Sequence, residues 1–190
     1  MSKILRYATA GVAMAALGIA SGAQAATTDS ANATAEILTA LSVDVDTTAD
    51  TLDFGTIADG GITANQSITV DTTGARGACP TNLICGGTTA APTFHVSGLG
   101  GRTVQVSFVN TSETLSYDTV VNGGPAPVGF ASAMTVNSLV TDASYNSVTN
   151  QVLLDAGGLA DFAVGGTLIV QPNMAPGVYN GTLTVSVAYN

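Results

Sequence analysis

Apolar and polar residues alternate along the last fourteen residues of the chain, 177–190. From Tyr179 onward the odd-numbered positions are apolar apart from Gly181, and most even-numbered positions carry Asn, Thr or Ser. A period of two residues is typical of a β-strand with one buried face, because successive side chains of a strand point to opposite faces. We therefore predict that the chain ends on a strand, whose edge another chain segment can pair with.

The same alternation marks residues 31–45, where Thr39 is the one polar residue on the apolar face. We predict a strand here as well. This strand has two possible partners, since it can join the sheet of its own domain or add to the sheet of a neighbouring molecule.

Short strand candidates separated by clusters of Gly, Pro, Asn and Asp fill the middle of the chain. They are residues 51–57, 67–71, 93–97, 103–109, 115–121, 134–140, 151–154 and 166–170. We predict an all-β fold, an immunoglobulin-like or jelly-roll β-sandwich of about eight to ten short strands. A transmembrane barrel is disfavoured, because such barrels need longer strands and aromatic girdles, and this chain has no Trp and 5% aromatic residues.

The first residues of the chain are typical of a secretory signal peptide. Lys3 and Arg6 precede an apolar stretch over residues 7–20, and Ala23 and Ala25 place small residues at a cleavage site. We predict a signal peptide over residues 1–25 and one β-sandwich domain over residues 26–190. The domain is expected to be exported to the periplasm, the cell surface or the extracellular space.

From Ala26 onward the chain is strongly acidic and contains no lysine. Arg76 and Arg102 stand against thirteen acidic residues, a net charge of −11. Nucleic acid is excluded as a partner, because no basic patch is present to neutralise phosphates. No stretch beyond residue 25 is long and apolar enough for a transmembrane helix, so none is expected in the mature chain.

The two cysteines, Cys79 and Cys85, lie six positions apart in a turn-like segment of an exported chain, which predicts a disulfide. Zinc or redox chemistry is disfavoured, because the spacing is not Cys-x-x-Cys and His95 is the only histidine. His95 is predicted to lie on the outer face of a strand. No nucleophile elbow or metalloprotease motif accompanies it, so we predict no catalytic residue, no cofactor and no enzymatic activity.

Four carboxylates, Asp44, Asp46, Asp50 and Asp53, form the densest acidic group of the sequence. Calcium prefers several oxygen ligands from one loop, but this spacing does not match an EF-hand. We interpret these residues as turn and surface carboxylates and predict no metal site, although calcium binding stays open at this point.

Several motifs resemble one family over essentially the whole mature chain. They are Leu-Asp-Phe-Gly-Thr-Ile at 52–57, Ser-Ile-Thr-Val-Asp at 67–71, residues 94–98, Val-Gly-Gly-Thr-Leu at 164–168 and the closing segment 177–189. In this order they resemble the bacterial family called domain of unknown function 4402. The resemblance implies a secreted β-sandwich-like domain without a settled biochemical function. The cysteine segment is an insertion relative to the family's usual pattern.

The last strand also resembles that of chaperone-usher pilin subunits, which carry a glycine fourteen residues from the end and a penultimate tyrosine. Gly177 and Tyr189 occupy those positions here. The resemblance implies that a periplasmic chaperone reads this strand and that the N-terminal extension of the next subunit completes the sheet. The expected donor residues are Ile37, Leu41, Val43 and Val45. The expected C-terminal assembly strand comprises Gly177, Tyr179, Leu183, Val185, Val187 and Tyr189.

These observations predict a secreted, non-enzymatic surface-structural protein, a fimbrial subunit that assembles with identical subunits by β-strand addition. The alternative is a monomeric extracellular binding module for a glycan or an adhesive ligand. Tyr117, Phe130 and Tyr145 are its aromatic candidates, and they are scattered through loop-rich stretches.

Overall fold

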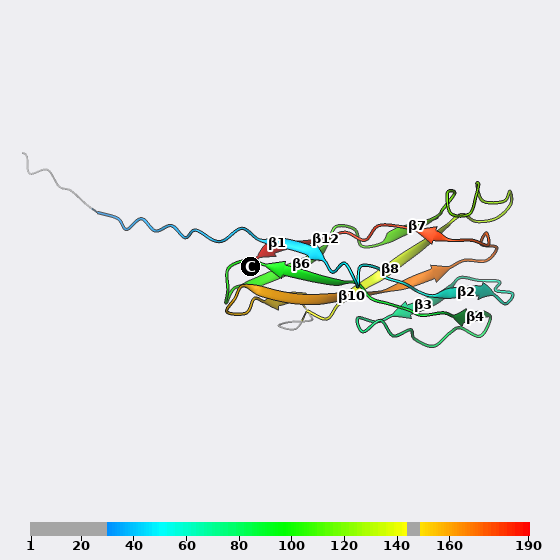
Figure 1. Ribbon diagram of the computed structural model, residues 1–190, viewed down its shortest axis with the longest axis horizontal. Coiled ribbons are helices and arrows are strands. Elements are labelled where there is room, and N and C mark those ends of the chain that lie inside the picture. Colours follow the sequence, from blue (N-terminus) through cyan, green and yellow to red (C-terminus); the bar gives the residue numbers. More distant parts are fainter. Residues whose placement is uncertain (1–29, 144–148) are drawn as a thin grey trace, which may run out of the picture. The chain divides into compact units, whose positions relative to one another are not determined.

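The computed structural model describes residues 30–143 and 149–190 (Figure 1). The predicted signal peptide therefore lies outside the described residues. Residues 30–36 are exposed and have no regular secondary structure, and the folded unit comprises residues 37–190. The part of the chain that is described forms strands and loops, which confirms the prediction of an all-β fold. It contains no helix of sufficient length and apolar character to cross a membrane.

Twelve strands are present among the described residues, more than the eight to ten that the sequence predicts. They are β1 (Ser42–Val45), β2 (Thr56–Asp59), β3 (Gln66–Val70), β4 (Leu83–Gly86), β5 (Thr93–Ser97), β6 (Thr103–Phe108), β7 (Glu113–Tyr117), β8 (Ala133–Thr141), β9 (Gln151–Leu153), β10 (Leu159–Val170), β11 (Tyr179–Asn180) and β12 (Val185–Tyr189). All pairs between these strands are antiparallel.

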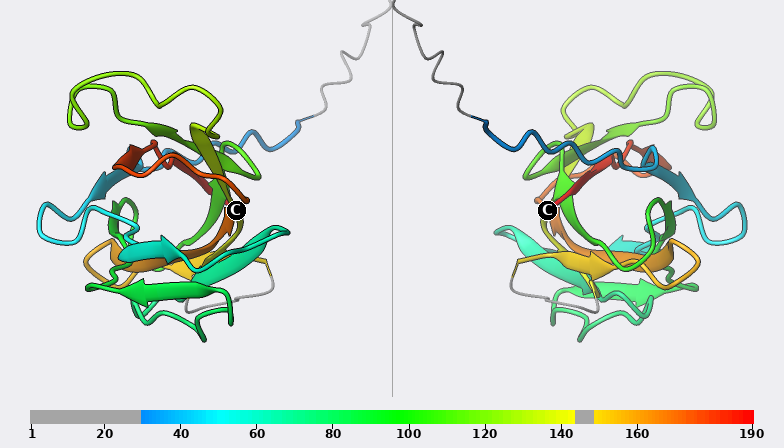
Figure 2. Two further views of the ribbon diagram at one scale, coloured as in Figure 1. Left: turned by 90° about the vertical axis from the view of Figure 1, so that its right-hand side faces the viewer. Right: turned by 90° about the vertical axis from the view of Figure 1, so that its left-hand side faces the viewer.

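The strands form three sheets, consistent with the predicted β-sandwich. The largest has the order β1-β5-β10-β8-β7-β11, with β3 also paired to β10. The second has the order β12-β6-β9, and the third is the β2-β4 pair. Seen end-on, the sheets of the folded unit curve around a common interior (Figure 2).

β10 is the longest strand, and its two halves pair with different strands of the large sheet. Its first part, Leu159 to Ala163, pairs with β5, and its second part pairs with β8 and β3. The register shifts between Gly165 and Thr167. A side chain at Gly165 would collide with the backbone oxygen of Val70, so a glycine is needed where β3 and β10 approach each other so closely.

Two clusters of buried apolar side chains form the core. The first lies between β5, β10 and the β12-β6-β9 sheet and contains Phe94, Val96, Val104, Val106, Ala143, Val152, Leu154, Phe162 and Val164. The second lies between β3, β8, β10 and the β2-β4 pair and contains Phe54, Ile62, Ile68, Val70, Leu83, Val136, Leu168 and Val170. Half-buried Leu139 packs against both clusters.

The alternating pattern accounts for which side chains of a strand are buried and which are exposed. In β5 the side chains of Phe94 and Val96 are buried, and His95 between them is exposed. Phe94 stacks on Phe162 of β10 with ring centroids 5.3 Å apart. The strand predicted over residues 93–97 has the observed bounds, and His95 lies on the outer face as expected.

Several predicted strands need correction. The strand expected over residues 166–170 begins at Leu159, and the closing strand expected over 177–190 is divided into Tyr179–Asn180 and Val185–Tyr189. The strand expected over residues 31–45 comprises only Ser42–Val45, the residues that lie in register beside β5. The strand expected over 51–57 starts at Thr56. The strand expected over 115–121 is Glu113–Tyr117, because the Asp118 carboxylate accepts hydrogen bonds from the Val120 and Val121 amides and turns the chain.

The predicted disulfide is confirmed: the sulfurs of Cys79 and Cys85 are 1.97 Å apart and the Cα atoms 6.0 Å apart. The bridge encloses the start of β4, a strand that the sequence pattern did not indicate. Closing so short a loop contributes about 2 kcal/mol in the loop-entropy model. The bridge therefore stabilises the β2-β4 pair locally.

Candidate functional site

Seven of the twelve strands pair with a single strand of the described chain: β3, β4 and β9, and four strands in the first and last segments of the folded unit. β1 pairs with β5, β2 with β4, β11 with β7, and β12 with β6. β1 and β2 belong to the segment 41–59 near the start of the folded unit, and β11 and β12 belong to the closing segment 177–189. The two segments thus present a series of strand edges without ladder partners, each able to accept an added strand.

These two segments lie side by side on the molecule. β1 and β12 contact each other although no backbone ladder joins them, and their arrowheads point in opposite directions (Figure 1). The hydroxyl of Tyr189 in β12 donates a hydrogen bond to the carbonyl oxygen of Thr39 at 2.9 Å. The edges of β1 and β12 therefore approach each other at this end.

Half-buried apolar side chains line the region between the two segments, which we call the apolar seam. On the first core cluster they are Leu41, Val43, Leu183, Val185, Val187 and Tyr189, and on the second they are Leu52, Ile57, Leu115, Met134 and Met174. In the neighbouring strand β6, by contrast, Val104 and Val106 are fully buried. The core is therefore less well covered along the seam.

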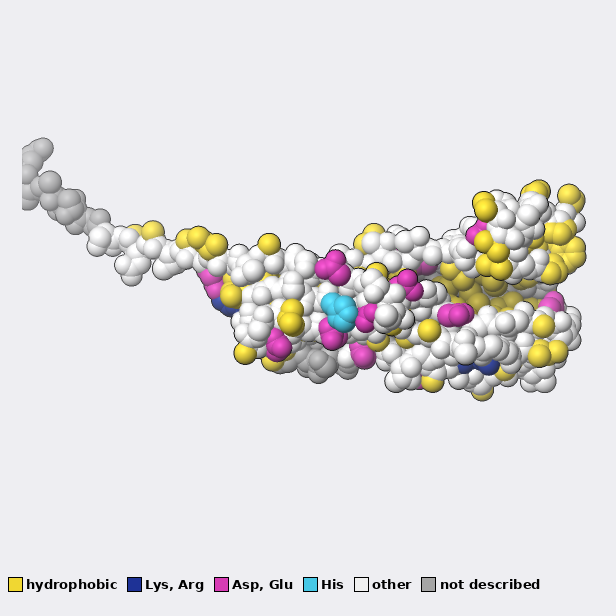
Figure 3. All heavy atoms as spheres, viewed as in Figure 1, with side chains coloured by type: hydrophobic (Ala, Val, Ile, Leu, Met, Phe, Trp, Pro, Cys, Tyr) yellow, Lys and Arg dark blue, Asp and Glu magenta, His cyan; other side chains and the backbone are white. Residues whose placement is uncertain are grey.

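The seam is hollowed at the end away from Tyr189. Figure 3 shows a recess lined by hydrophobic side chains in the right-hand part of the molecule. In the matching ribbon view, β11 and the loop after β7 lie above this recess and β2 lies below it (Figure 1). The seam is thus narrow between β1 and β12 and wide between β2 and β11.

The start of the closing segment is fixed against β7. Gly177 has a φ of 155°, and a side chain there would collide with the Tyr117 ring and the Asn122 amide. The Tyr179 ring meets the Tyr117 ring edge to face, with centroids 5.5 Å apart. The Tyr179 hydroxyl donates to the Ala175 carbonyl at 2.7 Å. Burial raises the pKa of Tyr179 above its usual range.

Tyr189 fastens the end of the chain to the opposite sheet. Its hydroxyl accepts a hydrogen bond from the Leu99 amide at 2.6 Å and donates to Thr39. Gly98 makes room for it, since a side chain there would collide with the Tyr189 hydroxyl and with Leu41. The sequence singled out Tyr189 by its position but gave no signal for these partners, which lie far away in the chain.

The remaining residues expected in the C-terminal strand also face the seam. Leu183, Val185 and Val187 pack on the first cluster, and only residues 185–189 form β12. Gly181 breaks the pattern because a side chain there would collide with the Thr114 carbonyl.

The four expected donor residues occupy different environments. Leu41 and Val43 pack against the core of their own domain. Val45 is 42% exposed and pairs in register with Phe94. Ile37 is 94% exposed. The structure therefore places Ile37 apart from the other three.

A histidine with two carboxylates joins three strands on the outer face. His95 Nδ1 lies 2.6 Å from Asp161 Oδ1 of β10, and His95 Nε2 lies 3.3 Å from Asp46 Oδ2, just after β1. Hydrogen bonding to Asp161, supported by Asp46, raises the pKa of His95. Bonds from the Thr48 amide and hydroxyl lower the pKa of Asp46. The sequence did not predict this pairing, because it depends on the register of β1, β5 and β10.

The acidic residues near β1 do not converge on one point. The Asp46 carboxylate is engaged with Thr48, the Asp53 carboxylate accepts a bond from the Gly55 amide, and Asp50 accepts one from Thr51. Within residues 30–143 and 149–190, no three His, Cys, Asp or Glu side chains are grouped so that they could hold a metal ion.

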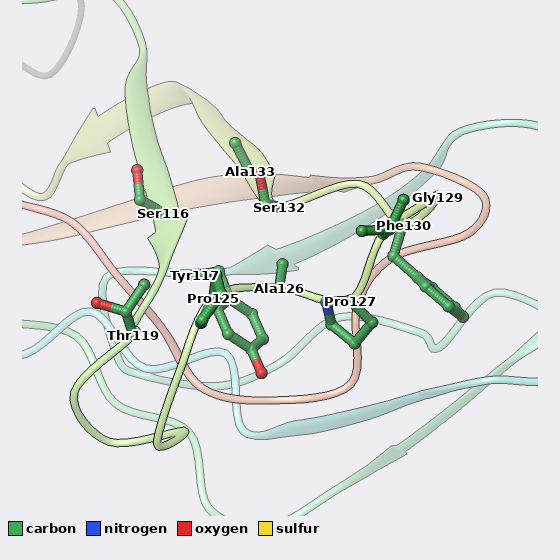
Figure 4. A pocket seen from close by; sticks show the side chains of 11 residues that line it. Ser116, Tyr117, Thr119, Pro125, Ala126, Pro127, Gly129, Phe130, Ser132 and Ala133 are labelled. Carbon is green, nitrogen blue, oxygen red and sulfur yellow. The ribbon is translucent and has the colours of Figure 1, made fainter.

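A cavity of about 470 Å³ lies under the loop that joins β7 to β8. Tyr117 and Phe130 both line it, so the structure brings together two of the three aromatic candidates of the alternative prediction. Tyr145 lies outside the described residues. Figure 4 shows Tyr117, Pro125 and Pro127 close together, with the Phe130 ring beyond Pro127.

Comparison with known proteins identifies the family. The family model described as Domain of unknown function (DUF4402) matches residues 43–189. No curated protein and no solved structure matches the chain. The match covers most of the chain and all twelve strands except the first residue of β1. This chain therefore belongs to the DUF4402 family.

Proposed function

We propose that this protein is an exported, non-enzymatic structural subunit that assembles with copies of itself by β-strand addition. The observation that carries the proposal is the apolar seam, flanked by strands whose outer edges have no ladder partner in the described chain. An added strand would satisfy backbone groups along those edges and cover half-buried side chains, the two sources of affinity in this mode of recognition.

The donor in this proposal is the N-terminal segment of a second copy, residues 26–39. Its described part, from Ser30 onward, is exposed, and Ile37 projects almost completely into solvent. Ala31, Ala33, Ala35 and Ile37 share one face of the alternating pattern. Leu41 and Val43 are engaged in their own core, so the donor ends before β1.

Residues 31–37 of the proposed donor would span about 23 Å as a strand at about 3.3 Å per residue. Donor side chains of alanine size at three positions and one isoleucine would fit a seam whose floor is already largely packed.

Export belongs to the same proposal. The predicted signal peptide would carry the chain out of the cytoplasm, and the disulfide of Cys79 and Cys85 suits an oxidising compartment. A periplasmic chaperone that covers the seam before assembly would be the expected partner, because an open apolar seam promotes uncontrolled association.

A synthetic peptide of residues 26–40 tests the donor directly. We expect the fluorescently labelled peptide to bind the mature chain and to raise its thermal midpoint, since a ligand of the folded state stabilises it. An Ile37→Asp peptide should bind at least about tenfold more weakly, because a carboxylate would be transferred to an apolar site.

The matched control is a Thr34→Asp peptide, which carries the same charge on the opposite face of the strand. This peptide should bind within about twofold of the original, because its extra carboxylate would face solvent. Equal affinities of all three peptides, or no binding of any, would contradict the proposal.

One observation favours the alternative of an extracellular binding module: Tyr117 and Phe130 line one cavity. A Phe130→Ala variant should then lose binding on a glycan array while the chain stays monomeric. Assembly of the unmodified mature chain would contradict this alternative.

A further inference from the structure

We propose that the loop joining β7 to β8, residues 118–132, is the surface on which the body of the donor copy rests, so that copies join head to tail. This inference rests on the proposed strand addition and concerns a second contact, outside the seam. We call these residues the apolar loop.

The direction of the donor follows from which end of the seam is closed. At one end the Tyr189 hydroxyl joins Leu99 and Thr39, so the chain's own residues 37–41 already occupy the exit. A donor strand is followed by a whole domain, and that domain needs an open end of the seam. The body of the donor must therefore lie at the other end, between β2 and β11.

This direction also gives the donor a favourable pairing. A strand that runs from the Tyr189 end toward the β2 and β11 end is antiparallel to β12, whose arrowhead points the opposite way (Figure 1). β12 is longer than β1, and antiparallel ladders are slightly more stable per residue than parallel ones.

The apolar loop flanks the open end of the seam because polar side chains fasten it to the closing segment. Asn122 exchanges two hydrogen bonds with the backbone of Val178, both 2.9 Å long. The Asn180 amide donates to the Asp118 carboxylate at 2.6 Å. The loop is therefore held in one position beside the strand that the donor would join.

The loop holds apolar side chains in solvent. Val120 is 87% exposed, Val121 63%, Val128 102% and Phe130 44%. A contiguous exposed apolar patch on a fixed loop is typical of an interaction surface. Figure 3 shows hydrophobic side chains gathered at this corner of the molecule.

The absence of charge on the loop beyond Asp118 favours a second copy as the occupant. Residues 119–132 contain no charged side chain, whereas the chain as a whole carries a net charge of −9. Two acidic copies repel each other wherever carboxylates face each other. Contact through an uncharged apolar face therefore has the smallest electrostatic penalty.

The opposite end of the folded unit also exposes apolar side chains, which could contact the apolar loop. The turn after β5 and the turn before β10 meet there, since the Gly98 amide donates to the Gly158 carbonyl at 2.8 Å. Leu159 beside these turns is 58% exposed and Leu153 is 44% exposed. We assign these leucines as the surface that meets the apolar loop of the next copy.

Cysteine cross-linking tests this contact in the full mature chain. Both native cysteines are engaged in the disulfide, so introduced thiols report only new contacts. Under mild oxidation, a V128C chain mixed with an L159C chain should form at least about ten times more cross-linked dimer than a V109C chain mixed with L159C. Val109 is a suitable control because it is 59% exposed and follows β6, outside the loop.

Charge substitutions separate this contact from the seam. V120D and V128D should weaken self-association in sedimentation experiments at least about tenfold, and V109D should not. All three should bind the peptide of residues 26–40 within about twofold of the original chain. Such binding shows that the variants fold, and substitution of a side chain as exposed as Val128 removes no internal packing.

The inference is overturned if V120D and V128D assemble like the original chain, or if cross-linking does not exceed the V109C control. It is also overturned if the loop variants lose glycan binding while assembly is unchanged. If the unmodified chain neither assembles nor binds the peptide, strand addition itself fails, and that result is visible before any loop variant is made.

Discussion

At the scale of single residues, His95 links three strands through two carboxylates. Asp161 is the nearer partner, 2.6 Å from Nδ1, and Asp46 lies 3.3 Å from Nε2. The imidazolium can donate to both at once, and this requires protonation of both ring nitrogens. The charge state of one side chain therefore affects how β1 is attached to β5 and β10.

The stability of the protein should depend on pH through this group. The folded state raises the pKa of His95 above 6.5. Its contribution to stability is therefore fully present below about pH 6.5 and is lost as the pH rises through the raised value. The chain has one histidine, so a single imidazole signal in NMR reports the titration.

Substitution of each carboxylate should show how much it raises the pKa of His95. Asp161→Asn should lower the pKa of His95 more than Asp46→Asn, because the hydrogen bond to Asp161 is the largest cause of the shift. A His95→Gln variant should lose the decline in stability that begins above about pH 6.5. An identical titration of His95 in both Asn variants would contradict this account.

At the scale of elements, the closing segment is held by close packing at Gly177. Its φ of 155° and the nearness of Tyr117 both disfavour a side chain there. We expect Gly177→Ala to lower the free energy of unfolding by about 2 to 4 kcal/mol, the range of strained and overpacked positions. The shift in the midpoint of urea unfolding measures this loss of stability.

Gly124 provides a matched control for this substitution. Its φ is 157°, almost the same as that of Gly177, but no atom lies within 4 Å of the position that a side chain would take. Gly124→Ala should therefore show only the cost of the backbone conformation, about 1 kcal/mol or more. Equal losses for the two variants would mean that contact with Tyr117 contributes nothing.

The elements that alternation predicts well are those with one clearly buried face. The strand over residues 93–97 was predicted with its observed bounds, because Phe94 and Val96 are buried and His95 is not. Residues 31–41 alternate equally well but form no strand in the described chain. Alternation shows that a segment is suited to form a strand. It does not show which strand the segment pairs with, because pairing depends on tertiary structure.

The candidate site was predictable in part. The closing strand followed from the alternation of apolar and polar residues, and Gly177 and Tyr189 were singled out by the resemblance to pilin subunits. The seam could not be predicted from the sequence, because its prediction requires the knowledge that β1 and β12 lie in different sheets. β4 was missed because Leu83 to Gly86 is too short to show a period, and its partner β2 is separated from it in the sequence by β3.

At the scale of the whole molecule, acidity should set the salt dependence of assembly. The net charge is −9 over the full chain and −11 from Ala26 onward. We expect self-association to strengthen as ionic strength rises from about 0.01 to 0.15 M, because the Debye length falls from about 30 to 8 Å and repulsion between copies is screened.

Sedimentation at several salt concentrations measures this dependence. Sodium chloride and sodium sulfate at equal ionic strength serve to separate screening from the additional strengthening of hydrophobic contacts by sulfate. Weaker association at higher salt would instead indicate oppositely charged surfaces in contact, contrary to an uncharged apolar interface.

β10 belongs to both core clusters, and it begins only at Leu159. Before this strand leaves the ribosome, β5 lacks its inner neighbour and β3 and β8 have nothing between them. Neither half of the core can close before β10 has been made, so folding of the unit must wait for this strand. The order of the strands thus keeps the nascent chain from folding while residues 37–158 are being synthesised.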